Sequence, residues 1–252
     1  HYFIYRCRYG TLMSASFSVH FDHSDFVIVE KAAGVNFHDE DIPASGLFSQ
    51  LKAQYKNDTL YPVHRLDKMT SGLLIVAKSL TCAQYFQQQF AQRNIDKYYL
   101  AISDQKPKKK QGLITGDMVK SRRGTWKLLR TKVNPAITQF FSVSLENKLR
   151  LFCLKPHTGK THQIRVALAS IGAPIIGDNY YHAKAGTKSR SEPCDRGYLH
   201  AFCVRFTYQT EQFSFTAPPS TGGLFLTDNF QQKLEQLGDP AALPWPKLPA
   251  SK

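Results

Sequence analysis

The chain has 252 residues, 42% of them hydrophobic, which is enough for one large domain or two small ones and excludes wholesale disorder. Its 33 lysines and arginines against 19 aspartates and glutamates give a net charge of +14, which favours a polyanionic partner such as RNA. No apolar stretch approaches the ~18 residues that a membrane-spanning helix needs, so the sequence predicts no such helix.

Residues 1–12 begin without methionine and differ in character from the rest of the chain. We expect Met13 to be the natural start and residues 1–12 to be non-native. The expected organisation is an N-terminal segment over 1–16, one domain over 17–238, and a Pro-rich tail over 239–252 that packs loosely or not at all.

Strand-like runs dominate the domain, because short stretches of β-branched and aromatic residues recur between turn signals. We expect strands at 26–30, 73–78, 98–102, 136–143, 149–154, 199–206 and 212–215. Helices are expected at 46–56, after a Ser79 cap through Phe90, after a Thr161 cap through Ile171, and at 227–237. Strands outnumber helices without regular alternation, which predicts an α+β fold.

The five cysteines are scattered and form no C-x-x-C pair, so neither a disulfide framework nor a zinc ribbon is predicted. Most are expected to be small buried side chains in a reducing compartment. The nine histidines show no H-E-x-x-H spacing, so no metal is expected. With no signal-peptide core either, cytoplasm is the expected location.

The most informative segment is residues 64–72, which read HRLDKMTSG. Asp67 lies between Arg65 and Lys68, whose positive charges favour an ionised carboxylate. The run LLIVA comes next and predicts a buried strand, so Asp67 is expected at the entry to the core. One such aspartate alone more often forms a structural ion pair. The whole string is what favours a functional site.

This string resembles the active-site segment of the RluA-type RNA pseudouridine synthases. Further segments resemble the same family in the same order, from about residue 18 to about residue 220: FVIVEKAAGV at 26–35, KYYLA at 97–101, TGKTHQIRV at 158–166, PIIGD at 174–178, RGYLHA at 196–201 and FTAP at 215–218. Departures from the family pattern are Ala32, where proline is usual, and Ala167 after the QIR segment.

The resemblance implies a pseudouridine synthase-like domain with an extended mixed, mostly antiparallel sheet, a few flanking helices and a central cleft. It implies that the enzyme flips a uridine out of the RNA stack and isomerises it without a cofactor. Asp67 matches the nucleophile, Arg165 the basic residue beside it, and Tyr99 the tyrosine that stacks on the flipped base. Whether Asp67 attacks C6 of the uracil or C1′ of the ribose stays open.

RNA contacts are expected from residues around these motifs and from a basic stretch. The first set comprises His64, Arg65, Lys97, Lys160 and Ile164, with a structural histidine as the alternative for His64 and plain helix capping as the alternative beside Lys160. In the basic stretch 106–132, Arg122 and Arg123 are the favoured phosphate contacts and Trp126 offers a ring face to a base. The alternative for residues 107–112 is a solvated hairpin loop.

The expected partner is a tRNA or rRNA stem-loop, and the expected state is a monomer. Only some 20 residues precede the similarity, too few for the small N-terminal RNA-binding module of many family members, so this domain is expected to grip RNA by itself.

Two other functions compete. A P-loop NTPase is suggested by GKT at 159–161, but Leu154 stands where the first glycine belongs and Pro156 lacks the N–H that a phosphate cradle needs. The second alternative is a non-catalytic RNA-binding or remodelling protein on the same fold. The presence of Asp67, Tyr99 and Arg165 together favours an active enzyme over it.

Overall fold

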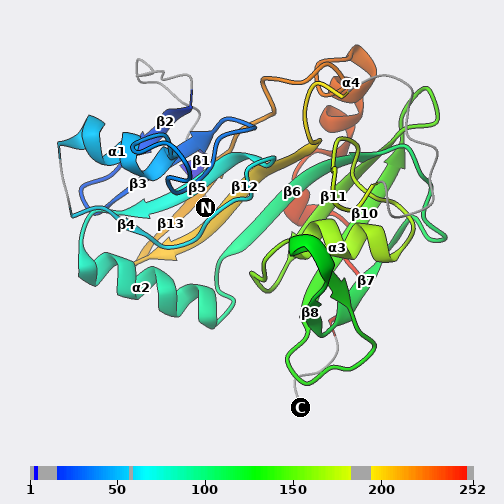
Figure 1. Ribbon diagram of the computed structural model, residues 1–252, viewed down its shortest axis with the longest axis horizontal. Helices are drawn as coiled ribbons and strands as arrows, with labels where there is room; N and C mark the ends of the chain where they lie inside the picture. The colour runs from blue at the N-terminus through cyan, green and yellow to red at the C-terminus, as the bar shows by residue number, and fades with distance from the viewer. Residues whose placement is uncertain (1–2, 5–15, 57–58, 183–193, 249–252) are drawn as a thin grey trace. The chain divides into compact units, whose positions relative to one another are not determined.

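The computed structural model describes residues 3–4, 16–56, 59–182 and 194–248 (Figure 1). The chain forms two compact units: unit 1 comprises His1–Asp96 and His200–Pro218, and unit 2 comprises Lys97–Leu199 and Pro219–Lys252. The expectations about Met13 and residues 1–12 lie outside the described residues, except for Phe3–Ile4.

Unit 1 is a sheet with two helices. Its strands run in the order β2 (Phe17–Asp22), β3 (Phe26–Lys31), β5 (Ser71–Ala77), β12 (Leu199–Tyr208, in this unit from His200) and β13 (Glu211–Thr216). β4 (Tyr61–Pro62) also pairs with β5, and β1 (Phe3–Ile4) with β13. Only the β5–β12 and β1–β13 pairs are parallel among the described strands of this unit. The helices are α1 (Leu47–Tyr55) and α2 (Leu80–Ala91).

The core of unit 1 is aromatic on one side of this sheet. Its rings meet at centroid distances of 5.2–5.6 Å, for example Phe26 with Phe206 and Phe213, and Phe86 with Phe206. Every residue of β5 is buried, because the strand has neighbours on both edges and side chains over both faces. β5 is therefore a rigid support for the segment that leads into it.

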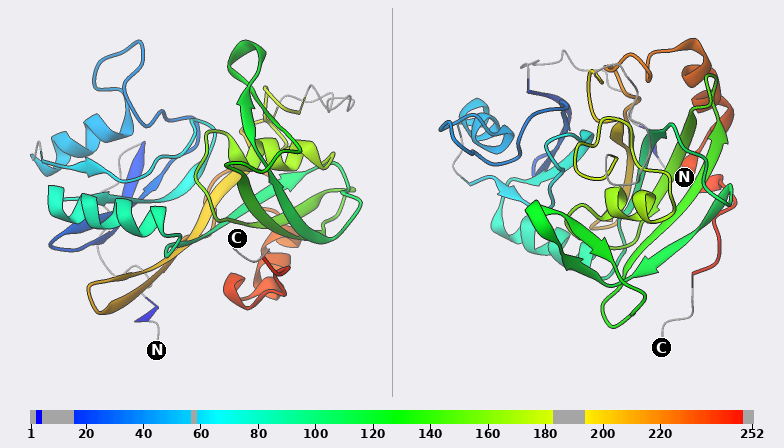
Figure 2. Two further views of the ribbon diagram at one scale, coloured as in Figure 1. Left: turned by 90° about the horizontal axis from the view of Figure 1, so that it is seen from below. Right: turned by 45° about the vertical axis from the view of Figure 1, so that its right-hand side comes forward.

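Unit 2 is an antiparallel sheet in the order β6 (Asp96–Ser103, in this unit from Lys97), β11 (Arg150–Pro156), β10 (Ala136–Ser144) and β7 (Gln111–Gly116). A separate hairpin joins β8 (Met118–Lys120) to β9 (Trp126–Leu128) through a 3₁₀ turn, η1 (Arg122–Gly124). The helices are α3 (Gln163–Ser170), α4 (Asp228–Leu237) and a 3₁₀ turn, η3 (Pro240–Ala242). Figure 2 shows this unit from two further sides.

The two faces of the unit 2 sheet carry different elements. Thr138 in β10 accepts a hydrogen bond from the Gln163 side chain of α3, 3.0 Å away. Its neighbour Gln139 contacts Pro246 in the C-terminal segment. Side chains alternate along a strand, so α3 lies on one face and the C-terminal segment on the other.

The structure confirms the α+β fold and all seven expected strands, with ends shifted by a few residues. It also confirms the helices after Ser79 and Thr227, whose side chains accept hydrogen bonds from Cys82 N–H and Phe230 N–H. The expected cap at Thr161 is wrong.

The helix after Thr161 begins one residue later than expected, at Gln163. His162 occupies the N-cap of α3 in a left-handed conformation (φ 57°) and makes no capping bond. The Gln163 side chain accepts hydrogen bonds from the Lys160 N–H and the Thr158 hydroxyl instead, at 3.1 and 2.6 Å. A turn held by these contacts overrides the local preference for a threonine cap.

Residues 239–248 of the tail contact unit 2 at Trp245, while most of their side chains are exposed. The Trp245 ring lies 6.0 Å from the Tyr98 ring, and its indole N–H donates to the Pro240 carbonyl at 2.8 Å. Burial of a large aromatic side chain stabilises the docked segment despite its prolines.

Within the described part of the chain, no helix has the length and apolar character to cross a membrane. The same residues hold no cluster of three metal-ligating side chains. Three described cysteines, Cys82, Cys153 and Cys203, are buried as expected, and Cys194 is exposed.

Candidate active site

A buried lysine, Lys31, holds the segment that carries Asp67. The Thr70 N–H donates to the Asp67 carbonyl at 3.0 Å, which closes a tight turn just before β5. The next carbonyl, that of Lys68, accepts from Gly34 N–H at 2.8 Å and from the Lys31 ammonium at 3.2 Å. Lys31 is fully buried, and it also donates to the carbonyls of Ala32 and Val35 at 2.8 and 2.7 Å. The peptide after Asp67 is therefore fixed.

The start of β5 is fixed by a close approach to β12. Gly72 (φ +108°) lies so near the neighbouring strand that a Cβ would meet the Ala201 carbonyl oxygen at 2.3 Å, so only glycine fits. Beside it, the Ser71 hydroxyl lies 2.7 Å from His200 Nδ1, and His200 Nε2 lies 2.7 Å from the Ala217 carbonyl. Ser71 and Gly72, the last two residues of the motif, are thus buried scaffold.

His64 fills a gap along the edge of β5. This edge pairs with β12 at Ser71 and Gly72 and with β4 at Val76 and Ala77. Between them, the Ile75 N–H donates to His64 Nε2 at 2.9 Å. That contact supports the structural alternative for His64 over the expected RNA contact. Arg65 is exposed and Leu66 is buried, so Arg65 stays a predicted RNA contact.

Arg165 lies in unit 2, in the first turn of α3, and its charge is matched by Asp178. Its Nε and Nη2 donate to the two carboxylate oxygens at 2.7 and 2.9 Å, and both side chains are at most 5% exposed. This charge-assisted fork fixes the guanidinium plane. The rings of Tyr180 and Tyr181 lie 5.5 and 5.1 Å from the guanidinium carbon.

Two adjacent tyrosines of β6, Tyr98 and Tyr99, lie on opposite faces of the sheet. Tyr98 packs against Trp245, and the Lys155 ammonium lies 5.2 Å from its ring. It therefore faces the C-terminal segment, and alternation directs Tyr99 to the opposite face, the one that carries α3. Unit 2 thus presents Tyr99 and Arg165 on one face of its sheet, while Asp67 belongs to unit 1.

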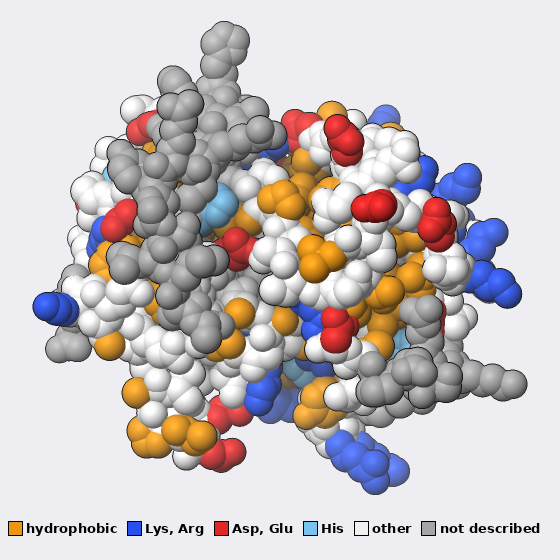
Figure 3. Space-filling view, turned by 90° about the horizontal axis from the view of Figure 1, so that it is seen from above, with side chains coloured by type: hydrophobic (Ala, Val, Ile, Leu, Met, Phe, Trp, Pro, Cys, Tyr) orange, Lys and Arg blue, Asp and Glu red, His pale blue; other side chains and the backbone are white. Residues whose placement is uncertain are grey.

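The favoured phosphate contacts occupy the tip of the β8–β9 hairpin. Arg122 and Arg123 are exposed in η1, and Arg123 adopts a left-handed conformation (φ 54°). The Lys120 ammonium lies 6.0 Å from the half-buried Trp126 ring. At the base of the hairpin, hydrogen bonds from the Val133 N–H and other donors lower the pKa of Asp117, the one acid of this stretch. In the space-filling view, Lys and Arg side chains gather along the right-hand edge and also project at the lower edge (Figure 3).

The other expected RNA contacts are less exposed. Ile164 is buried, which argues against direct contact with RNA. Lys97 is half-buried, and burial lowers the pKa of its ammonium to about 8. Lys160 is half-buried beside the turn that begins α3.

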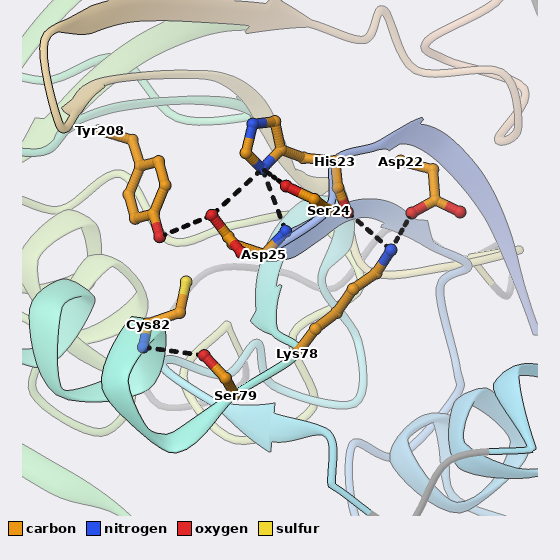
Figure 4. Close-up of polar contacts among 8 residues, drawn as sticks. All are labelled: Asp22, His23, Ser24, Asp25, Lys78, Ser79, Cys82 and Tyr208. Atoms are coloured by element: carbon orange, nitrogen blue, oxygen red, sulfur yellow. Dashed lines mark hydrogen bonds and ion pairs between the residues drawn. The ribbon is translucent and has the colours of Figure 1, made fainter.

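A second polar cluster, at the far end of β5, is structural. Lys78 pairs with Asp22, and the Tyr208 hydroxyl donates to Asp25 at 3.0 Å (Figure 4). Burial raises the pKa of the neighbouring Cys82 thiol, which keeps it unreactive. β5 has seven residues, about 20 Å of strand, so this cluster lies well away from the Asp67 turn.

The sequence did not reveal three residues that support the Asp67 turn and Arg165. Lys31 and Asp178 stand inside strings quoted for the resemblance, so their positions were visible, but their contacts were not. Tyr181 had no signal of its own.

Comparisons with known proteins agree with these motifs. A family model described as RNA pseudouridylate synthase matches residues 25–170. The chain is 48% identical over 215 residues to a Haemophilus influenzae protein named uncharacterized RNA pseudouridine synthase, covering 85% of this chain and 93% of that one. It is 28% identical to the ribosomal large subunit pseudouridine synthase C of Vibrio vulnificus, covering 76% of this chain and 62% of that one.

Among solved structures, the chain resembles human RNA pseudouridylate synthase domain containing 1, with a TM-score of 0.69 and 25% identity over 95% of this chain and all of that one. From the family match and the extent of the shared sequence, this chain belongs to the RNA pseudouridine synthases, which are RNA-modifying isomerases.

Proposed function

We propose that this enzyme converts a specific uridine in a tRNA or rRNA stem-loop to pseudouridine, with Asp67 as the nucleophile. The observation that carries the proposal is the Asp67 turn, whose following peptide is clamped by Lys31 and Gly34. A nucleophile needs a fixed position relative to a flipped base, and this clamp supplies it.

The proposed reaction breaks the N1–C1′ bond, turns the uracil and forms a C5–C1′ bond. The uridine leaves the stack so that the Asp67 carboxylate can add to C6 of the ring or to C1′ of the ribose. The proton at C5 then leaves and one returns to N1, so no atoms are gained or lost. Arg165 supplies positive charge to the reacting carboxylate, and the Tyr99 ring stacks on the uracil. Water is excluded, because water at C1′ would give hydrolysis.

We propose ribosomal RNA as the first candidate substrate and transfer RNA as the second. Three relatives carry "ribosomal large subunit" in their names. Structured single-stranded loops are what proteins of this kind can read, because an unpaired base is cheapest to flip. We place the enzyme in the cytoplasm with these RNAs, acting as a monomer through one catalytic domain over residues 17–238.

The test maps pseudouridine in total rRNA and tRNA from a strain that lacks the protein. RNA is incubated with wild type, with Asp67→Asn, or with Asp41→Asn, whose exposed carboxylate serves as a matched control. Carbodiimide-stop sequencing then locates new sites. We expect one or few sites with wild type and Asp41→Asn, and a loss of at least about 1000-fold in rate with Asp67→Asn, because an amide cannot replace the nucleophile.

RNA binding measured in parallel separates the alternatives. Unchanged affinity in Asp67→Asn with no turnover supports the catalytic role. Turnover that survives Asp67→Asn removes Asp67 from the mechanism. Tight binding by wild type with no new site in either RNA favours the non-catalytic RNA-binding protein.

A further inference from the structure

One tyrosine hydroxyl joins the β8–β9 hairpin to the start of α3. The Trp126 N–H, first in β9, donates to the Tyr181 hydroxyl oxygen at 2.9 Å. The same oxygen lies 2.9 Å from Nδ1 of His162, the N-cap of α3. All three residues belong to unit 2. A single atom therefore bonds both elements.

The ring of this tyrosine also supports Arg165. Tyr181 is 5% exposed, and its ring centroid lies 5.1 Å from the guanidinium carbon. Asp178 accepts from the Tyr181 N–H at 3.3 Å and pairs with Arg165 through the same oxygen. The backbone of Tyr181 is thus tied to the partner of Arg165, and its side chain is tied to the hairpin.

The hydroxyl bonds the hairpin at a point away from its base. β8 and β9 pair with each other in a separate two-stranded sheet. Asp117 fixes the base of the hairpin through the Val133 and Asn134 N–H groups. Trp126 lies nearer the tip, opposite Lys120 and after the exposed Arg122 and Arg123.

We propose that Tyr181 is a positioning residue, whose hydroxyl locks the RNA-contacting hairpin onto α3 so that bound RNA is placed in register with Arg165. This inference rests on the proposed function, because it takes the hairpin as an RNA contact and Arg165 as part of the reaction centre. Tyr181 itself touches neither RNA nor the reacting atoms in this role.

The first test needs no turnover. Hydrogen exchange of the Trp126 amide is measured in wild type and in Tyr181→Phe, which keeps the ring and removes the hydroxyl. We expect exchange at least about 10-fold faster in the variant, because the amide loses its acceptor. The Leu129 amide, which donates to the Asp117 carbonyl at 2.7 Å, is the internal control and should not change. Equal protection of Trp126 in both proteins overturns the lock.

The second test is a double-mutant cycle on the RNA site mapped above. Tyr181→Phe is expected to lower kcat/KM about 10-fold in the wild-type background and less than about twofold in Arg122→Ala/Arg123→Ala. The salt dependence of total tRNA binding should be unchanged, because no charge is removed. Tyr85→Phe, which loses a hydroxyl bonded to the Thr207 carbonyl in unit 1, is the matched control.

These outcomes separate the inference from the function beneath it. A full loss of about 10-fold that persists without the two arginines means that Tyr181 acts on fold or on Arg165 alone, and the lock is wrong. If wild type forms no pseudouridine, the proposed function fails. The difference in Trp126 amide exchange between wild type and Tyr181→Phe, with and without added total tRNA, still shows whether the Tyr181 hydroxyl holds the hairpin.

Discussion

Lys31 and Arg165 are both buried cations, and the protein satisfies them in different ways. Arg165 has a full carboxylate partner in Asp178, whereas Lys31 donates to three backbone carbonyls. Three carbonyl oxygens can satisfy a lysine ammonium, because the ammonium has three N–H groups to donate. The difference matters for function. A carboxylate pair sets the direction of one side chain, but the three carbonyls of the Lys31 clamp belong to two separate segments and join them.

Replacing Lys31 should therefore loosen the Asp67 turn. We expect Lys31→Met to lower the free energy of unfolding by about 2–4 kcal/mol, since hydrogen bonds to a buried charge are lost. We also expect kcat to fall more than KM rises, because the nucleophile loses its fixed position. Urea unfolding and the mapped pseudouridine assay measure the two effects. Lys68→Met, which removes an exposed ammonium from the same turn but leaves the carbonyl that Lys31 holds, is the control. Wild-type kcat in folded Lys31→Met would contradict the clamp.

We expect His20 to make the stability of unit 1 depend on pH. It is the extra residue of a bulge in β2, between Val19 and Phe21, and no described residue bonds its Nε2. Burial lowers the pKa of His20, because the charged imidazole is poorly solvated there. The unfolded chain then binds a proton more readily than the folded chain. Stability is thus full above the ordinary histidine pKa of about 6.5 and declines as the pH falls below it.

We expect His20→Gln to reduce this decline. Urea unfolding at about pH 7.5 and about pH 5.5, on either side of the ordinary histidine pKa, measures it. His38→Gln, at an exposed histidine, is the control for the substitution itself. An identical loss of stability in wild type and His20→Gln would show that other groups carry the pH dependence.

At the scale of elements, the β8–β9 hairpin and strand β5 differ in burial and pairing. β5 is buried throughout and supports the turn that carries Asp67. The two short strands of the hairpin pair with each other, and the turn between them carries exposed arginines. The exposed arginines lie at the tip of the hairpin, beyond the Tyr181 bond to Trp126. A buried support strand and an exposed basic tip fit an enzyme that must both hold RNA and act on one base.

Removal of the hairpin arginines should weaken RNA binding without regard to sequence. We expect Arg122→Ala/Arg123→Ala to reduce the slope of log K against log salt by about 1.5 for total tRNA, as two lost phosphate contacts require. Filter binding across salt concentrations measures the slope. Arg93→Ala is a matched control, because Arg93 is also exposed and left-handed (φ 62°). An unchanged slope would place the RNA contacts elsewhere.

At the scale of the whole molecule, charge and fold are separate properties. The net charge of +14 attracts any polyanion, and phosphate contacts carry little sequence information. In the proposed reaction, specificity must come from the side chains that a flipped base would meet. The basic composition therefore accounts for the expected affinity for RNA, and the motif residues account for the proposed type of reaction.

The sequence by itself determined the family, the fold class and the seven main strands. Each of these rests on a local signal, such as the nine-residue motif or a short β-branched run. The Ser79 cap likewise indicates the helix that follows it. Strands with weaker local signals were missed. β2 is broken by its bulge, β7 contains two glycines, and β8 and β9 have only three residues each.

Only the tertiary structure decided how the motifs are held. Lys31 meets the Lys68 carbonyl across 37 residues, Ser71 meets His200 across 129, and Trp126 meets Tyr181 across 55. The left-handed His162 cap and the docked Trp245 likewise depend on distant partners. Periodicity and capping preferences act over a few neighbouring residues, whereas these contacts form only after the chain has folded. Residue types can therefore identify the chemistry, but the supports that fix the reacting groups arise from folding.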